Sequence, residues 1–140
     1  MDSIKVTVPV TIKAKLTENL RKKLLENLAN NLKQAEYEIQ QLNLEEQRVL
    51  KEVNPDENTP EGHNELMAIR NHFEMERNKR EEYRAGALEE KSTIEKLGLG
   101  AEIEQGTLDR QVEIKIGDDM RDVMNMEVLV EDDKVIAIRG

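Results

Sequence analysis

Three aspartates, Asp118, Asp119 and Asp122, form the cluster whose chemistry comes closest to that of a metal site. Carboxylate oxygens are ligands that Mg²⁺ and Ca²⁺ prefer. The spacing is not that of a calcium-binding loop, and no glutamate stands at the closing position. An aspartate just before a short helix also caps its first turn, and we favour this interpretation for Asp118 or Asp119. The sequence leaves divalent-ion binding by the three carboxylates open, and the acidic run at 131–133 is interpreted as a turn.

No other residues are spaced for catalysis. The two histidines, His63 and His72, are nine residues apart, which does not place them on one helical face at ligand spacing. Neither has a nearby serine, threonine or acid arranged as a triad. The absence of cysteine excludes thiol catalysis, disulfides and Cys-built zinc sites, and no glycine-rich phosphate loop is present. We therefore predict that the protein is not an enzyme and has no catalytic residue, cofactor or metal.

Two basic clusters could contact phosphate groups. The first comprises Arg77, Lys79, Arg80 and Arg84, and the second is the run Arg21–Lys23. Glutamates interleave with the first cluster, and intrahelical ion pairs at spacings of three and four explain this pattern better than RNA binding does. The net charge of −9 also disfavours nucleic acid as a partner. An RNA- or ribosome-associated factor that uses Arg77, Arg80 and Arg84 is the alternative hypothesis.

The composition indicates long helices. Charged residues make up 36% of the 140 residues and aromatic residues only 2%, which leaves too few large side chains for a thick core. Leu, Ile, Val and Phe still make up about a quarter of the chain, above the roughly 20% below which disorder is expected. No apolar run approaches the ~18 residues of a membrane span, and the N-terminus does not resemble a signal peptide. We expect a cytoplasmic protein with no membrane partner.

The N-terminal part, residues 1–16, predicts one strand. From Ile4 to Lys15 apolar and polar residues alternate strictly, as in a strand with one buried face. Proline cannot donate a ladder hydrogen bond, so Pro9 predicts that this strand lies at a sheet edge or is broken there.

Residues 17–97 predict an antiparallel helical hairpin. Apolar residues recur at steps of three and four in two segments, 17–53 and 60–97, joined by a proline-containing turn near 54–60. Two helices of equal length with a short turn fold back on one another, here as a coiled coil. The expected ends are caps at Thr17 and Thr59 and a stop at Gly98.

The heptad pattern permits two registers. Leu42 faces either Phe73 or, one heptad further along, Arg80, and the position of the turn favours Phe73. In that register Leu32 faces Tyr83. Charged residues interrupt the two apolar seams at Glu46, Glu76, Arg80 and Glu90.

Strand patterns return in the C-terminal part, residues 98–140. Ala101–Leu108 and Val112–Ile116 are two strand candidates, and a short helix with Met120 and Met124 follows the turn at Gly117. Two further strands, 127–131 and 134–139, flank Asp132 and Asp133, as in a hairpin with a two-residue turn. Closing the helical hairpin brings the first strand beside these. We predict an α+β fold, with a long helical hairpin projecting from a small β head built from the N-terminal and C-terminal strands.

The end of the sequence is similar to that of a known family. The stretch Ile114-Lys-Ile-Gly-Asp-Asp and the stretch Glu127-Val-Leu-Val-Glu-Asp-Asp-Lys-Val-Ile-Ala-Ile-Arg139 resemble the close of the bacterial YlqD family. The order of a strand, a Leu-rich heptad helix, a second charged helix and a short β segment resembles that family over nearly the whole chain. The resemblance implies this architecture and no assigned activity. A distant likeness to prefoldin rests on β hairpins combined with a helical coil, although the termini of prefoldin lie at the coil tips.

We interpret the protein as a non-enzymatic interaction or scaffold protein that acts through the hairpin and the β head. The sequence does not identify its protein partner. A β head of this size has a marginal core, and the charged seam residues leave the hairpin poorly buried. We therefore expect a homo-oligomer, with a symmetric dimer favoured. Met120 and Met124 are the candidate contact residues, because flexible methionines suit contact surfaces.

Overall fold

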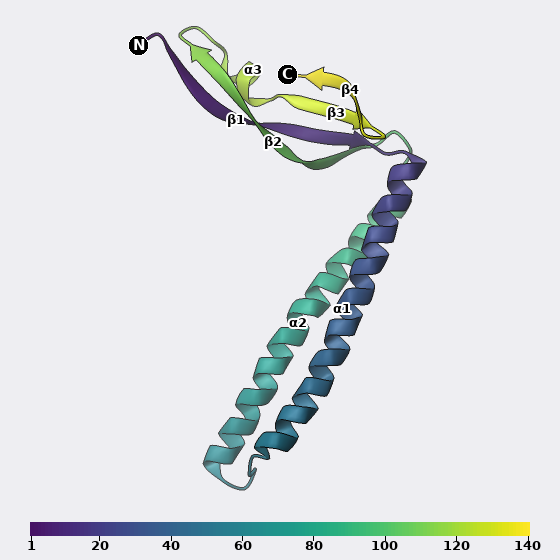
Figure 1. Ribbon diagram of the computed structural model, residues 1–140, viewed down its shortest axis with the longest axis vertical. Coiled ribbons are helices and arrows are strands. Elements are labelled where there is room, and N and C mark those ends of the chain that lie inside the picture. The colour runs from purple at the N-terminus through teal and green to yellow at the C-terminus, as the bar shows by residue number, and fades with distance from the viewer. The chain divides into compact units, whose positions relative to one another are not determined.

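The computed structural model describes residues 1–140, and it confirms the predicted α+β fold (Figure 1). In chain order the elements are β1 (Ser3–Lys15), α1 (Glu18–Val53), α2 (Pro60–Lys96), β2 (Glu102–Lys115), α3 (Met120–Met124), β3 (Glu127–Glu131) and β4 (Lys134–Arg139). The chain divides into two compact units. The sheet unit comprises Met1–Lys23 with Lys96–Gly140, and the hairpin unit comprises Leu24–Glu95.

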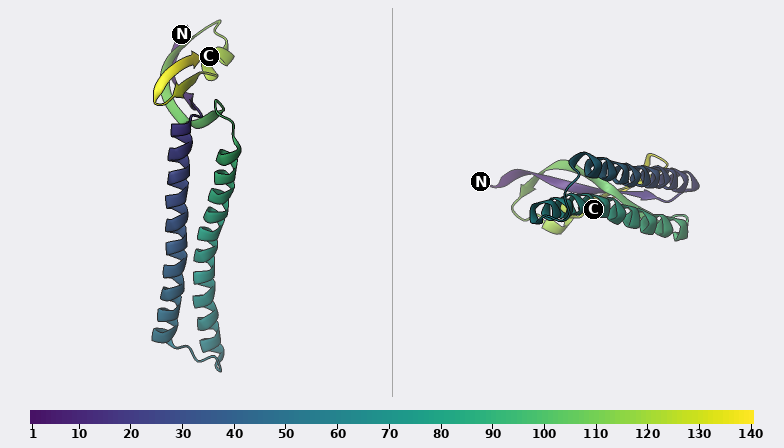
Figure 2. Two further views of the ribbon diagram at one scale, coloured as in Figure 1. Left: turned by 90° about the vertical axis from the view of Figure 1, so that its right-hand side faces the viewer. Right: turned by 90° about the horizontal axis from the view of Figure 1, so that it is seen from below.

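Both long helices begin where the sequence predicts, because a threonine caps each of them. Thr17 Oγ1 accepts a hydrogen bond from the backbone N–H of Leu20 (3.1 Å), and Thr59 Oγ1 accepts one from that of Gly62 (3.0 Å). These bonds satisfy N–H groups that the first turn of a helix leaves free. α1 and α2 run side by side in opposite directions (Figures 1 and 2). The predicted helical hairpin is therefore confirmed.

The second helix ends close to the predicted stop at Gly98, but Gly98 is not the left-handed glycine of the following turn. α2 ends at Lys96, and the glycine with a left-handed backbone is Gly100, with φ at +88°. The N–H of Gly100 donates to the carbonyl of Leu16 (2.8 Å), and the N–H of Leu16 donates to that of Ala101 (2.7 Å). The turn at Gly100 therefore leads directly into the pairing of β2 with β1.

The core of the hairpin unit is narrow. Its buried residues in α2 include a series at seven-residue spacing, Leu66, Phe73, Ala87 and Ile94. Arg80 occupies the missing position of this series, and its side chain is 30% exposed. Leu28 of α1 packs with Ala87 and Ile94. These two are the partners that the two registers assign to Leu28, so the register stays a prediction.

The predicted seam is wrong at Tyr83, which is 52% exposed. Glu76 and Glu90 lie in the same row of α2, one heptad before and after Tyr83. Glu90 is exposed like Tyr83, whereas Glu76 is half-buried and pairs with Lys79 and Arg80. α2 therefore packs through the row from Leu66 to Ile94.

Gly62 allows the loop between the helices to close. A Cβ atom at this position would lie 1.9 Å from the carbonyl oxygen of Asp56. Thr59 holds the loop, because its hydroxyl donates to the same carbonyl (3.0 Å) and accepts from the N–H of Gly62. The sequence does not indicate this role, since the contact joins the first turn of α2 to the preceding loop.

The four strands form one sheet in the order β2-β1-β3-β4. β1 pairs antiparallel with β2 along its whole length and parallel with β3 from Thr11 to Ala14, and β3 pairs antiparallel with β4. The two strand candidates before Gly117 are one continuous strand, β2. Its register shifts at Gly106 (φ +144°), opposite Ile12, and this bulge is why the strand pattern looks interrupted in the sequence.

The prediction that Pro9 places its strand at an edge or breaks it there is wrong, because β1 lies inside the sheet and continues through Pro9. Thr11 donates its N–H to Met126, on the side of β1 where β3 pairs. Backbone groups two residues apart point to the same side of a strand, so the missing N–H of Pro9 faces that side as well. β3 pairs only from Thr11 onward, and no ladder hydrogen bond is lost.

The turn between β3 and β4 has the predicted form. Asp132 and Asp133 have φ at +46° and +68°, as a two-residue hairpin turn with two left-handed residues requires. None of the helices is both long enough and apolar enough to cross a bilayer.

Candidate interaction surface

The two faces of the sheet differ in charge. Residues that alternate along a strand share a face with the residues directly opposite them on the next strand. One face, which we call the apolar sheet face, contains in β1 and β2 the residues Ile4, Val6, Val8, Val10, Ile12, Ala14, Ile103, Leu108, Arg110, Val112 and Ile114. In β3 and β4 it contains Val128, Val130, Val135 and Ile138. No acidic residue stands among these positions, and Arg110 is the one charged residue.

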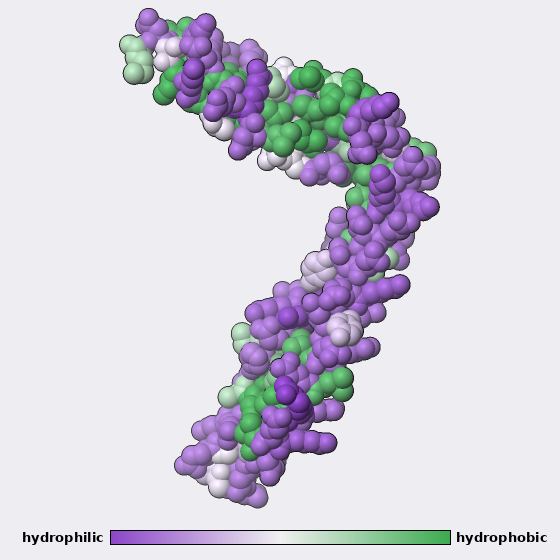
Figure 3. All heavy atoms as spheres, in the orientation of Figure 1, coloured by the Kyte–Doolittle hydropathy of each residue, from purple (hydrophilic) through white to green (hydrophobic).

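Much of the apolar sheet face is exposed. Leu108 is 65% exposed in β2, whereas Val135 and Ile138 are 60% and 70% exposed in β4. Only Val8 and Val10, in the middle of β1, are buried on this face. Hydrophobic residues gather visibly over the sheet in Figure 3. An antiparallel sheet ordinarily covers its apolar face with a second layer, and the exposed residues of this face have no such cover.

The short segment from α3 to Met126 packs against part of β1. α3 lies against β1, and the guanidinium of Arg110 donates to the sulfur of Met126, just after α3. Arg110 stands opposite Val8 in the ladder. The predicted contact residues, Met120 and Met124, lie on α3 and are 47% and 48% exposed. They therefore add flexible apolar groups beside the buried part of β1.

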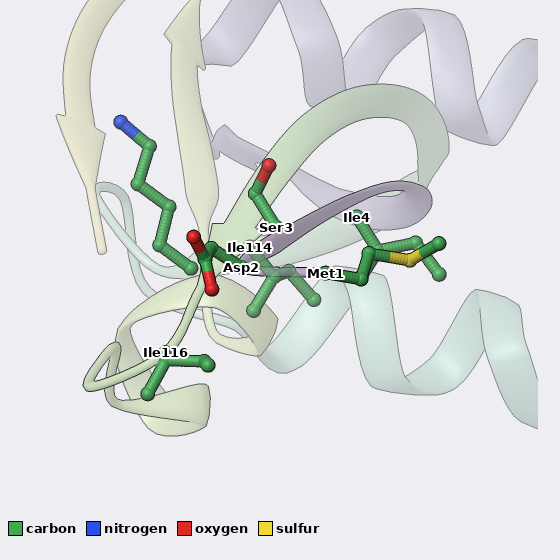
Figure 4. A pocket seen from close by; sticks show the side chains of 7 residues that line it. Met1, Asp2, Ser3, Ile4, Ile114 and Ile116 are labelled. Atoms are coloured by element: carbon green, nitrogen blue, oxygen red, sulfur yellow. The ribbon is translucent and has the colours of Figure 1, made fainter.

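A shallow hollow lies where β1 begins and β2 ends (Figure 4). Its volume is about 370 Å³, and its apolar lining consists of Met1, Ile4, Ile114 and Ile116. Ile4 and Ile114 are ladder partners on the apolar sheet face. The hollow is thus a continuation of that face, suited to receive an apolar side chain.

Ion pairs occupy the opposite face of the sheet. Lys13 Nζ lies 2.9 Å from a carboxylate oxygen of Glu127, and the guanidinium of Arg139 lies 2.5 Å from Glu102 and 3.6 Å from Glu127. The hydrogen bond from Lys13 is the main cause that lowers the pKa of Glu127 below its ordinary value. The same bond raises the pKa of Lys13. These pairs link all four strands of the sheet, and the sequence did not indicate them because most of these strands are distant in the chain.

The basic cluster on α2 is neutralised by α1. The nearest cross-helix pairs are Arg77 with Glu46 (2.6 Å), Arg80 with Glu38 (3.6 Å) and Arg84 with Glu36 (3.6 Å). Intrahelical pairs, as predicted, also occur: Arg80 lies 2.6 Å from Glu76 and Lys79 lies 3.1 Å from it. Hydrogen bonds from Arg80 and then Lys79 lower the pKa of Glu76. The sequence missed the cross-helix pairs, because they depend on how the two helices face each other.

In the second basic cluster, Arg21–Lys23, only the side chain of Arg21 makes polar contacts within the sheet unit. The Arg21 guanidinium donates to the carbonyl of Leu97, just after α2, and lies 3.6 Å from Glu18. Lys22 and Lys23 are exposed. A cation at the end of a helix stabilises its free carbonyl groups, which is a structural role for Arg21.

The cluster of Asp118, Asp119 and Asp122 has the predicted capping role. Asp119 is the N-cap of α3 and accepts hydrogen bonds from the N–H of Arg121 (2.9 Å) and from its guanidinium (2.7 Å). The side-chain bond is the main cause that lowers the pKa of Asp119. Asp118 accepts from the N–H of Lys115 (2.8 Å) and closes the preceding turn. Asp122 is exposed, and no three acidic or histidine side chains are grouped to hold a metal ion.

α1 carries a second, smaller apolar surface. Tyr37 and Leu44 are 56% and 60% exposed and stand seven residues apart, which places them on one side of the helix. A shallow hollow of about 380 Å³ lies beside Leu44, between Gln41, Glu45 and Arg48. These residues point away from the predicted seam, which is why the heptad pattern did not single them out.

The remaining candidates do not form a site. His72 packs the edge of its ring against Phe73, with the ring centres 5.2 Å apart. His63 is exposed, and its backbone N–H continues the first turn of α2 by donating to Thr59. The structure does not bring the two histidines together with an acidic cluster.

The model of the family described as "YlqD protein" matches residues 4–139. A crystal structure of a protein of unknown function from Synechococcus sp. WH 8102 is similar, with a TM-score of 0.89 and 23% identity over 99% of this chain and 95% of that chain. At this identity the likeness shows the fold alone. Comparison with curated proteins found no match.

Proposed function

The chain belongs to the YlqD family. We propose that it is a non-enzymatic interaction protein, or scaffold, that binds other protein surfaces. The observation that carries the proposal is the apolar sheet face, which has no acidic residue and leaves Leu108, Val135 and Ile138 exposed. Exposed apolar patches that charged residues surround are typical of protein–protein contacts.

The hairpin unit supports the same proposal. Tyr37 and Leu44 offer an aromatic and an aliphatic side chain on one side of α1, and aromatic residues are enriched where proteins bind one another. The chemistry-bearing side chains elsewhere have structural partners: Asp119 caps a helix and Arg77 pairs with Glu46. This favours a binding role over a catalytic one.

The alternative hypothesis, an RNA- or ribosome-associated factor, has no specific observation in its favour. Arg77, Arg80 and Arg84, on which it depends, each pair with a glutamate of α1. Phosphate binding would have to displace those carboxylates.

Affinity capture with the full-length chain tests the proposed function. The tagged protein and two variants, Leu108→Glu and Leu44→Glu, would be incubated with a native lysate and compared by quantitative mass spectrometry. We expect the wild type to capture proteins that an unrelated acidic control protein does not capture. At least one of the two variants should fail to capture them. Enrichment that neither variant changes would count against both surfaces, and no enrichment at all would refute the proposal.

A further inference from the structure

We propose that a second copy of this chain covers the apolar sheet face, so that two sheets stack face to face in a symmetric dimer. The inference rests on the proposed function, because it names one occupant of the surface on which that function depends. Two sheets that pack through their apolar faces form the two-layer core of a β-sandwich. Each copy would supply the layer that the other lacks.

The exposed area of the protein leaves room for a contact with a second copy. The protein exposes 10281 Å², whereas a compact monomer of 16.1 kDa is expected to expose about 7,400 Å². Part of the excess of roughly 2,900 Å² belongs to the two-helix hairpin, and the about 800 Å² that each partner buries in a stable complex is a fraction of that excess. In the sheet unit, exposed apolar residues lie at both edges of the face, Leu108 in β2 and Ile138 in β4. A stacked copy would cover both edges at once.

The distribution of charge favours the apolar sheet face as the contact between two copies. Each copy carries a net charge of −9, so two copies repel one another over most of their surfaces. The ladder positions of the apolar sheet face include no carboxylate. The opposite face carries acids such as Glu102, Glu113 and Glu127. Contact through the apolar sheet face is therefore the arrangement that brings no acidic pair together within the sheet.

Because both partners are copies of the same chain, we expect them to be related by two-fold symmetry. When the same surface of both copies makes the contact, the interface is closed and the assembly stops at two. Met120 and Met124 of α3, next to the buried part of β1, would adapt their side chains to the edge of the partner sheet. The other surfaces, including Tyr37 and Leu44 on α1, would stay available to different proteins.

Sedimentation equilibrium of the full-length chain tests the inference. We expect a mass twice the 16.1 kDa of one chain at micromolar concentration, and tighter association as salt screens the repulsion between the copies. Leu108→Glu places a carboxylate on the contact and should weaken dimerisation at least tenfold. Met75→Glu is the matched control, because Met75 is 63% exposed and lies on α2, and it should leave the dimer unchanged.

Several results would overturn the inference. They are a monomeric wild type, a dimer that Leu108→Glu leaves intact, or a dimer that Met75→Glu dissociates. Ile138→Glu serves as a second variant, and circular dichroism of both verifies that they are folded. If the wild type is monomeric but still captures proteins through Leu108, the proposed function holds and the dimer is refuted. If the wild type is a dimer but captures no protein, the dimer holds and the proposed function is refuted.

Discussion

The hydroxyl of Thr17 donates a hydrogen bond to Asp132 at 2.7 Å, although 115 positions separate the two residues. The same hydroxyl accepts from the N–H of Leu20 and so caps α1. Asp132 belongs to the left-handed turn between β3 and β4. One side chain thus joins the start of a helix to the last hairpin of the sheet unit.

Thr17→Val should destabilise the protein, because valine keeps the shape of threonine and removes both hydrogen bonds. Losing a threonine cap costs about 0.5–2 kcal/mol. Thr17→Ser is the matched control, since it retains the hydroxyl, and its cost should be smaller. The free energy of unfolding in urea measures both. Equal losses in the two variants would show that the hydroxyl is not responsible.

Gly62→Ala should destabilise the hairpin unit, since the new methyl group would lie 1.9 Å from the backbone oxygen of Asp56. Steric crowding of this kind costs about 1–3 kcal/mol. Gly86→Ala should have the opposite effect, because Gly86 is within α2 and has nothing within 4 Å of its Cβ position. Alanine stabilises a helix interior by about 1 kcal/mol over glycine. Thermal unfolding should rank Gly86→Ala above the wild type and Gly62→Ala below it.

Stability should depend on pH through Lys13 and Glu127. The pKa of Glu127 is lowered from its ordinary value of 4.5, so its contribution is present above that value and is lost as the pH falls through the lowered pKa. The pKa of Lys13 is raised from 10.5, so its contribution is present below that value and is lost as the pH rises through the raised pKa.

In Glu127→Gln, stability should fall less as the pH is lowered through the acidic range. The urea concentration at the midpoint of unfolding, measured at a series of pH values, tests this. Glu113→Gln is the control, because Glu113 lies on the same face of the sheet. If both variants changed the acid side equally, the pair with Lys13 would not be the cause.

A disulfide can determine the register of the hairpin, since the native chain has no cysteine. We expect a Leu42→Cys, Phe73→Cys variant to form an intramolecular bond more readily than a Leu42→Cys, Arg80→Cys variant. Disulfide formation requires Cα atoms about 4.4–6.8 Å apart, so only the facing pair should react efficiently. Mass spectrometry of the monomer fraction after mild oxidation measures both. Preferential reaction of the second pair would place the helices one heptad apart from the predicted register.

Binding to RNA should be absent even at low salt. The arginines at 77, 80 and 84 pair with glutamates of α1, and the net charge is −9. Fluorescence anisotropy with labelled single-stranded and duplex RNA tests this. Affinity that falls steeply with salt, as counterion release requires, and that disappears in the Arg77→Glu, Arg80→Glu variant would restore the RNA hypothesis.

The sequence by itself determined most of the elements of this protein, because these elements have local physical signals. The threonines at 17 and 59 offer hydroxyls to the first turn of a helix, and this marked the start of α1 and α2. Strict alternation marked β1, and two aspartates between apolar runs marked the turn from β3 to β4. The family likeness was also readable from residues near the C-terminus, and the family match confirms it.

Only the tertiary structure decided the order of the strands and which distant side chains meet. Pro9 predicted an edge for β1, but the short reach of β3 allows an inner strand to contain it. The pairs of Arg77 with Glu46 and Lys13 with Glu127 join residues far apart in the chain, and no local pattern records them. The same holds for the apolar sheet face. Alternation predicts that β1 has an apolar side, but whether a second layer covers that side depends on the packing of distant segments, and here only a short segment lies against it.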